Sequence, residues 1–264
     1  VDLFQNLTLG IDPKLFTSFQ IKNFFSKKNK IKLIEENLID NIFKTRFKVS
    51  KPFYYLDKNV TGESHLKKID RITKYLNKDK FNHILITAPE NVAWLLNIRG
   101  HDNPTSPIPN SYLILSNKKD IFLITDKEKS IKLIKQKRFK KLKIIKPNKI
   151  SNFLKKFKSN RILIDEKTCN IYLEDILNKR FKIIKKEDPI YLMKSIKNKI
   201  EINNMKKAHI IDGVALTKFL YWIKNINKKK ITEVDAQNKL EKFRRKNKNF
   251  LYPSFDTIAG SGKN

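Results

Sequence analysis

The sequence predicts an α/β fold with a central mixed sheet, and the pattern of residues 63–186 carries this prediction. Short apolar runs of strand length are interspersed there with segments in which apolar residues recur every three or four positions. Of the 264 residues, 40% are hydrophobic and 18 are Phe, which is enough to fill a core. No run approaches the roughly 18 apolar residues that a membrane span requires, so no membrane association is expected.

The first segment, residues 1–56, has too few patterned positions to form a stable domain alone. We expect it to be the C-terminal remainder of a larger first domain, with Phe53–Tyr55 and Gly62 marking a linker. Asp12-Pro13 predicts a turn or a helix start, and Ile31–Ile34 a short strand. Leu38–Phe43 has a helical spacing of apolar residues.

Residues 57–187 are predicted to form the α/β domain. A helical stripe opens it, at Leu66, Ile69, Ile72, Tyr75 and Leu76. The predicted strands are His83–Thr87, Val92–Arg99, Ser111–Leu115, Ile121–Thr125, Arg161–Asp165 and Phe181–Ile184. The predicted helices are Lys127–Phe139, Lys149–Phe157 and Asn170–Leu177.

Within this domain the segment after Val92 is the most informative. As a strand, Val92–Arg99 would place Trp94, Leu96 and Ile98 on one face and Leu95, Asn97 and Arg99 on the other. A loop with three prolines follows, and such a loop is stiff. Polar side chains beside a stiff loop suit the presentation of a binding site, although an edge strand with solvated ends explains the same pattern.

Residues 188–264 are predicted to begin a further, truncated domain. Asp188-Pro189 is typical of a helix start with Asp as N-cap, and the helical pattern continues to about Asn225 with a break near Asn198. Thr232–Asp235 has the form of a capping box with Asp in place of Glu. Phe250–Ile258 is predicted to be a strand, and Gly260–Gly262 a turn.

The formal charge of +32 invites a nucleic-acid interpretation, which the composition argues against. Only 8 of the 58 basic residues are Arg, the usual reader of phosphate and guanine. The Lys residues are spread along the whole chain, and Lys, Ile, Asn and Phe are over-used together, as A/T-rich codons would produce. No nucleic-acid partner is therefore expected.

No complete catalytic constellation is present in these residues. The four His lie in no tight metal-ligand spacing, and His209 with Asp212 is read as a pair on a helix surface. Cys169, the single cysteine, has no evident base partner and is expected to be a buried, idle thiol. A chain with one cysteine fits a reducing cytoplasm.

Residues Ile86–Asp102, followed by Pro107 and Ser111-Tyr112, resemble the second domain of three-domain aminopeptidase P (Xaa-Pro aminopeptidase). This family belongs to the creatinase/prolidase superfamily with a pita-bread catalytic domain. The run W-L-L-N-I-R-G is the most specific part, while His101 and Asn103 stand where Ser and an aliphatic residue are usual. Other segments agree in order: Ile11–Thr17, Asp188–Ala215, Thr232–Asp235 and Ser254–Gly262.

The resemblance implies a creatinase-type N-terminal α/β domain followed by the start of a pita-bread α+β catalytic domain. It implies removal of the N-terminal residue from peptides with proline second, by a hydroxide that bridges two divalent metal ions, usually Mn2+. In the family, the metal ligands follow the turn that corresponds to Gly260–Gly262. No catalytic or metal-binding residue therefore maps onto this chain, and the 264 residues alone are expected to bind no metal pair and to be inactive.

The resemblance further implies a cytoplasmic homodimer when the protein is complete. In the family the second domain lies over the catalytic cleft, so Arg99 and Asn97 are the best candidates for substrate binding, with His101 and Phe255 as weaker ones and Trp94 as core support. Two alternatives remain open. One is a prolidase or creatinase-type relative, and the other is a non-enzymatic pita-bread module that binds peptides.

Overall fold

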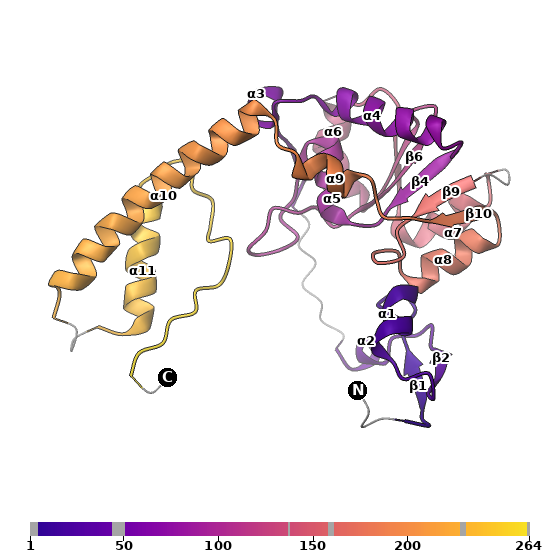
Figure 1. Cartoon of the computed structure of the whole chain (residues 1–264), viewed down its shortest axis with the longest axis horizontal. Coiled ribbons are helices and arrows are strands. Elements are labelled where there is room, and N and C mark those ends of the chain that lie inside the picture. Colours follow the sequence, from indigo (N-terminus) through magenta and orange to yellow (C-terminus); the bar gives the residue numbers. More distant parts are fainter. Residues whose placement is uncertain (1–4, 44–50, 137, 158–160, 228–230, 263–264) are drawn as a thin grey trace.

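The computed structural model describes residues 5–43, 51–136, 138–157, 161–227 and 231–262. Along the chain, Figure 1 shows a small N-terminal unit, a larger α/β unit and a pair of long helices that extends away from the sheet. The α/β unit lies between the other two. Within the described part of the chain, no helix has the length and apolar character needed to cross a membrane.

The α/β unit is built on one six-stranded sheet. Its strands are β4 (His83–Ile86), β6 (Tyr112–Ser116), β7 (Ile121–Ile124), β8 (Leu142–Ile145), β9 (Arg161–Ile164) and β10 (Lys182–Lys185). Their order across the sheet is β10-β9-β4-β6-β7-β8. The pairs β10–β9, β9–β4 and β7–β8 are parallel, whereas β4–β6 and β6–β7 are antiparallel. The predicted mixed sheet is confirmed.

Both faces of this sheet are buried. Ile84 and Ile86 enter the core on one face and Leu85 enters the core on the other, as the alternation along a strand requires. All four residues of β7 are buried as well. Strands covered on both sides have continuous apolar runs, which explains why β4 and β7 were found in the sequence. The partly exposed β8 was not predicted.

Helices cover the two faces. One face carries α4 (His65–Lys78), α5 (Pro89–Leu96), α6 (Lys127–Lys135) and α9 (Ile190–Ser195), and the other carries α7 (Ile150–Leu154) and α8 (Ile171–Asn178). On α4, Ile69, Ile72 and Leu76 are buried as the helical stripe predicts, while Leu66 is exposed. The helix predicted at Lys127–Phe139 ends at Lys135, and residue 137 lies outside the described residues.

The N-terminal unit pairs β1 (Thr8–Ile11) with β2 (Lys30–Leu33) in parallel, with α1 (Ser18–Phe24) between them and α2 (Leu38–Ile42) after them. The predicted strand and helical spacing are confirmed here, and Pro13 lies in a turn. The unit contacts α8, because Ser18 Oγ donates to Glu174 Oε2 at 2.9 Å.

The pair of long helices follows α9. Asn198 breaks the helical pattern as predicted, because its side chain caps α10 (Lys199–Asn225) by accepting from the backbone N–H of Glu201 at 3.0 Å. The predicted capping box at Thr232–Asp235 is also confirmed, and it opens α11 (Glu233–Arg244). In Figure 1, α11 folds back along α10.

Two predictions for this end of the chain need correction. Phe250–Ile258 is irregular instead of a strand, and no described residues pair with it, so its backbone groups have no sheet to join. Asp188 lies one residue before the N-cap position of α9, which Pro189 occupies, although the Asp188 carboxylate still accepts from the N–H of Ile190 at 2.9 Å.

Several short elements escaped prediction because two to four residues carry too little periodicity. They are β1, β8, β3 (Tyr54–Tyr55), α3 (Lys58–Thr61) and the 3-10 turn Pro147–Lys149. The strand β5 (Ile98–Arg99) is the end of the predicted strand Val92–Arg99. The antiparallel pair β3–β5 places Tyr54 opposite Arg99.

Candidate functional site

The segment with the most specific sequence pattern is mostly helical. The predicted strand Val92–Arg99 is wrong up to Leu96, and only Ile98–Arg99 form a strand. Pro89 lies in the first turn of α5, where its fixed φ and missing N–H are well suited. Leu95 and Leu96 enter the same core, whereas successive residues of a strand would point to opposite faces. The dipeptide Pro89-Glu90 is a helix-start signal, and it was the available indication.

Asn97 ends α5 and lies inside the fold. Its backbone is left-handed, with φ of 55°, which Asn tolerates better than most residues. Its side chain is 1% exposed. The amide donates to the Glu63 carbonyl at 2.8 Å and to Thr61 Oγ1 at 3.2 Å, and its oxygen accepts from Lys68 Nζ at 2.7 Å. The Asn97 side chain is therefore held inside the fold by α3, α4 and the residues that link them.

Lys68 is the second buried polar residue of this cluster. Its ammonium also donates to the Trp94 carbonyl at 2.9 Å and lies 4.2 Å from the centre of the Trp94 ring. Burial lowers the pKa of Lys68 to about 8, against smaller opposing effects of Glu201 and Glu63. The contacts of Lys68 hold both the backbone and the ring of Trp94 in place.

Arg99 follows on β5, with one end of its guanidinium fixed by the backbone. Nη1 donates to the Ile98 carbonyl at 2.9 Å and to the Ala93 carbonyl at 3.4 Å. Among the described residues, no carboxylate forms an ion pair with Arg99, and no hydrogen bond uses its Nε or Nη2. Burial lowers the pKa of Arg99. The Nε and Nη2 nitrogens of this half-buried guanidinium thus keep N–H groups that can bind an anionic group.

The loop after Arg99 is held by specific contacts. A Cβ on Gly100 would lie 2.7 Å from the Cα of Pro109, so only glycine fits there. Asp102 accepts from the backbone N–H of Asn110 at 2.7 Å and forms a nearly buried ion pair with Lys129 at 2.5 Å. The expected stiffness of this loop has a structural basis in these contacts.

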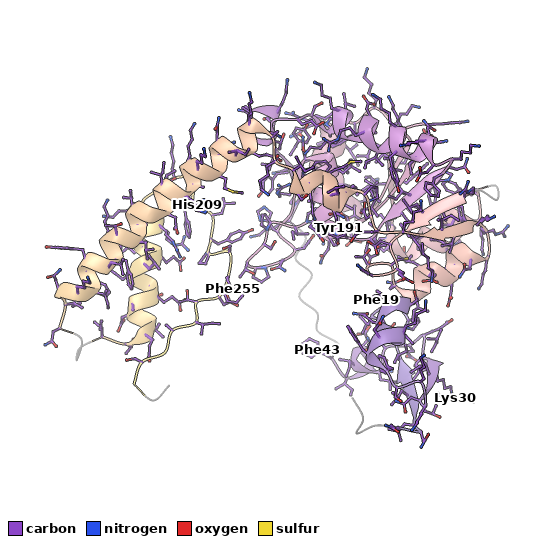
Figure 2. All side chains as sticks on the ribbon, viewed as in Figure 1. Phe19, Lys30, Phe43, Tyr191, His209 and Phe255 are labelled. Carbon is purple, nitrogen blue, oxygen red and sulfur yellow. The ribbon has the colours of Figure 1, made fainter. Side chains whose placement is uncertain are left out.

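A groove of about 870 Å³ lies between this segment and the start of the long helices. One wall comes from α5, β5 and the stiff loop, and the other comes from α9 and the first turns of α10. Figure 2 labels Tyr191, which α9 contributes to the second wall. The residues used below are Glu90, Trp94, Arg99, Tyr191, Lys194, Lys197 and Glu201.

A buried polar network fixes the two walls to each other. Asn91 on α5 donates to Asp188 at 2.8 Å, and it accepts from Lys194 on α9 at 2.5 Å. The backbone N–H of Asp188 donates to Asp165, which follows β9, at 3.0 Å. Burial raises the pKa of Asp188, while its hydrogen bonds from Ile190 and Asn91 oppose that effect. The groove is thus built on a fixed junction.

The carboxylates of the groove are already engaged. Glu90 accepts from the Tyr191 hydroxyl at 2.9 Å and lies 3.9 Å from Lys194 Nζ. Glu201 closes the capping box of α10 by accepting from the Asn198 N–H at 2.9 Å. Arg99 is therefore the groove cation whose guanidinium has no carboxylate partner among the described residues.

The described residues do not fit a metal pair. They contain no group of three or more His, Cys, Asp or Glu that could hold a metal ion. The expected His209–Asp212 contact is replaced by others, because His209 Nδ1 lies 2.9 Å from the Met205 carbonyl and Asp212 binds Arg244 through both oxygens. Cys169 is buried as expected, and burial raises the pKa of its thiol to about 12.

The four candidate site residues separate in the structure. Arg99 lines the groove, whereas Asn97, His101 and Phe255 do not. The His101 ring lies 5.3 Å from the ring of Tyr54, and Phe255 is 69% exposed on the irregular segment after α11 (Figure 2). Sequence reasoning missed Tyr191. Its helix was predicted, but its contact with Glu90 on α5 was not.

Comparison with known proteins assigns the family. The model of the Creatinase/Prolidase N-terminal domain matches residues 46–201, more than half of the chain. The chain belongs to this family. A second model, Metallopeptidase family M24, matches residues 203–264, where α10 and α11 lie. The fold is accordingly a creatinase-type α/β domain followed by the start of a pita-bread domain.

The chain is also similar to named relatives. It is 30% identical over 279 residues to a probable Xaa-Pro aminopeptidase P of Sordaria macrospora and 32% identical over 280 residues to one of Paracoccidioides brasiliensis. In each case 97% of this chain aligns with 45% of the relative. The crystal structure of a cytosolic X-prolyl aminopeptidase with a di-nuclear active site, from Caenorhabditis elegans, superimposes with a TM-score of 0.85 at 26% identity, over 98% of this chain and 44% of that one. The chain thus spans less than half the length of these relatives.

Proposed function

We propose that this chain is part of a metal-dependent aminopeptidase that removes the N-terminal residue from peptides with proline in the second position. The similarity to proteins named Xaa-Pro aminopeptidase P over 97% of the chain carries this proposal. The superposition on the X-prolyl aminopeptidase supports it independently of sequence alignment.

In this proposal the 264 residues contribute to substrate binding, and the metal ligands belong to residues of the complete enzyme outside them. Two divalent ions, with Mn2+ as the metal, belong to the complete enzyme. The described residues offer no set of ligands for them. Arg99 binds substrate from the groove, and Asn97 acts as a positioning residue behind it. His101 and Phe255 stay predictions.

The same proposal divides the chain into three parts. Residues 1–56 are the remainder of a first N-terminal domain, residues 57–187 are the second, creatinase-like domain, and residues 188–264 begin the pita-bread domain. The complete protein is proposed to be a homodimer in the cytosol. Light scattering on the complete protein tests the proposed homodimer, and a monomer at micromolar concentration would contradict it. Cell fractionation tests the proposed cytosolic location.

Activity measurements test the catalytic proposal directly. The complete protein with Mn2+ is expected to cleave the first bond of a tripeptide Xaa-Pro-Xaa, while the 264-residue chain is expected to be inactive. Cleavage restricted to Xaa-Pro dipeptides would indicate a prolidase, and absence of any turnover would indicate a peptide-binding module. Turnover by the 264-residue chain would contradict the proposal that the metal ligands lie outside these residues.

The role of Arg99 is tested in the complete enzyme by Arg99→Ala. Loss of a charge-assisted hydrogen bond is expected to lower kcat/KM by roughly tenfold or more. Arg180→Gln is the matched control, because Arg180 is exposed and lies outside the groove. Equal kinetics for Arg99→Ala and the control would contradict a substrate-binding role.

A further inference from the structure

Lys68 is a buried titratable residue that the proposed function leaves unexplained. It lies on α4 and is 1% exposed. Lysine is almost never buried completely unless it is paired, yet no carboxylate among the described residues forms an ion pair with Lys68. An ammonium that is kept from water and from carboxylates needs another source of stabilisation.

The end of α5 supplies that stabilisation through neutral groups. Lys68 Nζ donates to the Trp94 carbonyl at 2.9 Å and to the Asn97 amide oxygen at 2.7 Å. The Trp94 carbonyl belongs to the last turn of α5, where the helix dipole places partial negative charge that attracts a cation. Nζ also lies 4.2 Å from the centre of the Trp94 ring, a distance at which an ammonium is attracted to the ring face.

Other ionisable groups act on Lys68 from the elements around it. They are Glu63 before α4, His65 and Arg71 on α4, Arg99 on β5 and Glu201 on α10. Both carboxylates are engaged elsewhere, since Glu63 lies 3.4 Å from Arg71 and Glu201 caps α10. The carboxylates favour the ammonium and the guanidinium groups oppose it, so burial has the largest effect on the pKa of Lys68. His65 is neutral in alkaline solution, because burial lowers its pKa.

Loss of the Lys68 proton would weaken one contact and preserve the others. A neutral amine still has two N–H groups, which are enough for the Trp94 carbonyl and the Asn97 oxygen. It no longer carries the charge that attracts the ring face. Arg71, whose guanidinium carbon lies 5.3 Å from the same ring centre, stays charged. The hydrogen bonds therefore keep the end of α5 in place, and only the contact of Lys68 with the ring responds to pH.

We propose that Lys68 is a proton-dependent positioning residue: its ammonium holds the Trp94 ring against α4, and loss of its proton in mildly alkaline solution releases the ring while the end of α5 stays bound. Trp94 lines the groove, so the shape of that wall becomes dependent on pH. This device is contained in the 264 residues and does not depend on the proposed activity.

Tryptophan fluorescence of the 264-residue chain tests the release of the ring. The chain has two Trp residues, so in a Trp222→Phe background the emission comes from Trp94 alone. Between about pH 6.5 and pH 9.5 we expect this emission to change with a midpoint near pH 8, because burial lowers the pKa of Lys68 to about 8. Emission that stays constant over this range would overturn the proposal.

Magnetic resonance of lysine labelled with carbon-13 at Cε follows the proton itself and needs no substitution. One resonance is expected to titrate near pH 8, and those of exposed lysines near about pH 10.4. Titration of every lysine resonance above about pH 9.5 would contradict the proposal, because Lys68 would then stay charged over the range in which the ring is released.

Variants in the Trp222→Phe background assign the fluorescence change to Lys68. Lys68→Met has a similar length without a charge, so its emission should be independent of pH and resemble that of the Lys68 chain in alkaline solution. Lys68→Arg keeps its charge throughout and should resemble the Lys68 chain in acidic solution. Lys67→Met, at an exposed position of α4, is the matched control and should keep the transition. A transition that persists in Lys68→Met, or disappears in Lys67→Met, would overturn the assignment. Thermal melting monitors folding, and the resonance titration decides if a variant is unfolded.

Discussion

The α/β unit and the pair of long helices are stabilised in different ways. The α/β unit buries apolar residues on both faces of its sheet, in two clusters. On α10 and α11 only Ala215 is buried, and Ile210, Val214 and Tyr221 are 68%, 50% and 74% exposed. Among the described residues, α10 and α11 contact each other, but they bury little of the apolar surface that stabilises most helices in proteins.

The two regions also differ in the kind of contact that supports them. In the helix pair each helix begins with a local signal, a capping box at Asn198 or at Thr232, and the ion pair of Arg244 with Asp212 joins the two helices. In the α/β unit the determinants are long-range strand pairing and burial. We expect the two regions to respond differently to equivalent substitutions.

Removal of a large apolar side chain is expected to give the largest contrast. Leu123→Ala on β7 removes a side chain that is fully buried, and it should lower the free energy of unfolding by about 3 kcal/mol through lost transfer energy and a cavity. Leu220→Ala on α10, where Leu220 is 48% exposed, should cost well under about 1 kcal/mol. Urea denaturation of both variants measures this, and equal costs would break the comparison.

Protonation of His83 is expected to have the next largest effect. His83 on β4 is buried between Phe157 and Phe181, and burial lowers its pKa to about 4. In the unfolded state His83 binds a proton near pH 6.5. Its contribution to the free energy of unfolding is therefore fully present above that pH and is lost as the pH falls toward 4, by roughly 3 kcal/mol in total.

The measurement is the free energy of unfolding between pH 7 and pH 4. His83→Leu should remove this part of the pH dependence, since no titrating group remains in the cavity. His209→Leu on α10 is the matched control in the other region, because His209 is exposed. A pH profile of His83→Leu that equals that of the unaltered chain would contradict this account.

Removal of an N-cap is expected to have the smallest effect and to sharpen the comparison. Thr232→Ala should cost about 1 kcal/mol and lower the hydrogen-exchange protection of residues 233–244, since these helical residues have few other supports. Ser64→Ala at the start of α4 should cost a similar amount, yet leave α4 protected through its buried stripe. Equal loss of protection in both helices would show that the helix pair is as well supported as the sheet.

Sequence reasoning reached the fold more fully than the site. The strands at His83, Ser111, Ile121 and Arg161 were found because a sheet covered on both faces needs uninterrupted apolar runs. The segment Val92–Arg99 was misassigned, because eight mostly apolar residues fit a buried strand or a short buried helix equally well. That error also misplaced Asn97, which shares no face with Arg99 and lies inside the fold.

The amino-acid sequence by itself determined the α/β class, the helix break near Asn198, the capping box at Thr232, and the resemblance that the family comparison confirmed. Those properties depend on residues that are close together in the chain. Only the tertiary structure decided that Arg99 and Tyr191 line one groove, that Lys68 is buried against Trp94, and that Arg99 has no carboxylate partner among the described residues. The physical reason is that these contacts join segments that are distant in the sequence. Packing and charge bring the segments together, and no local sequence pattern encodes which faces will meet.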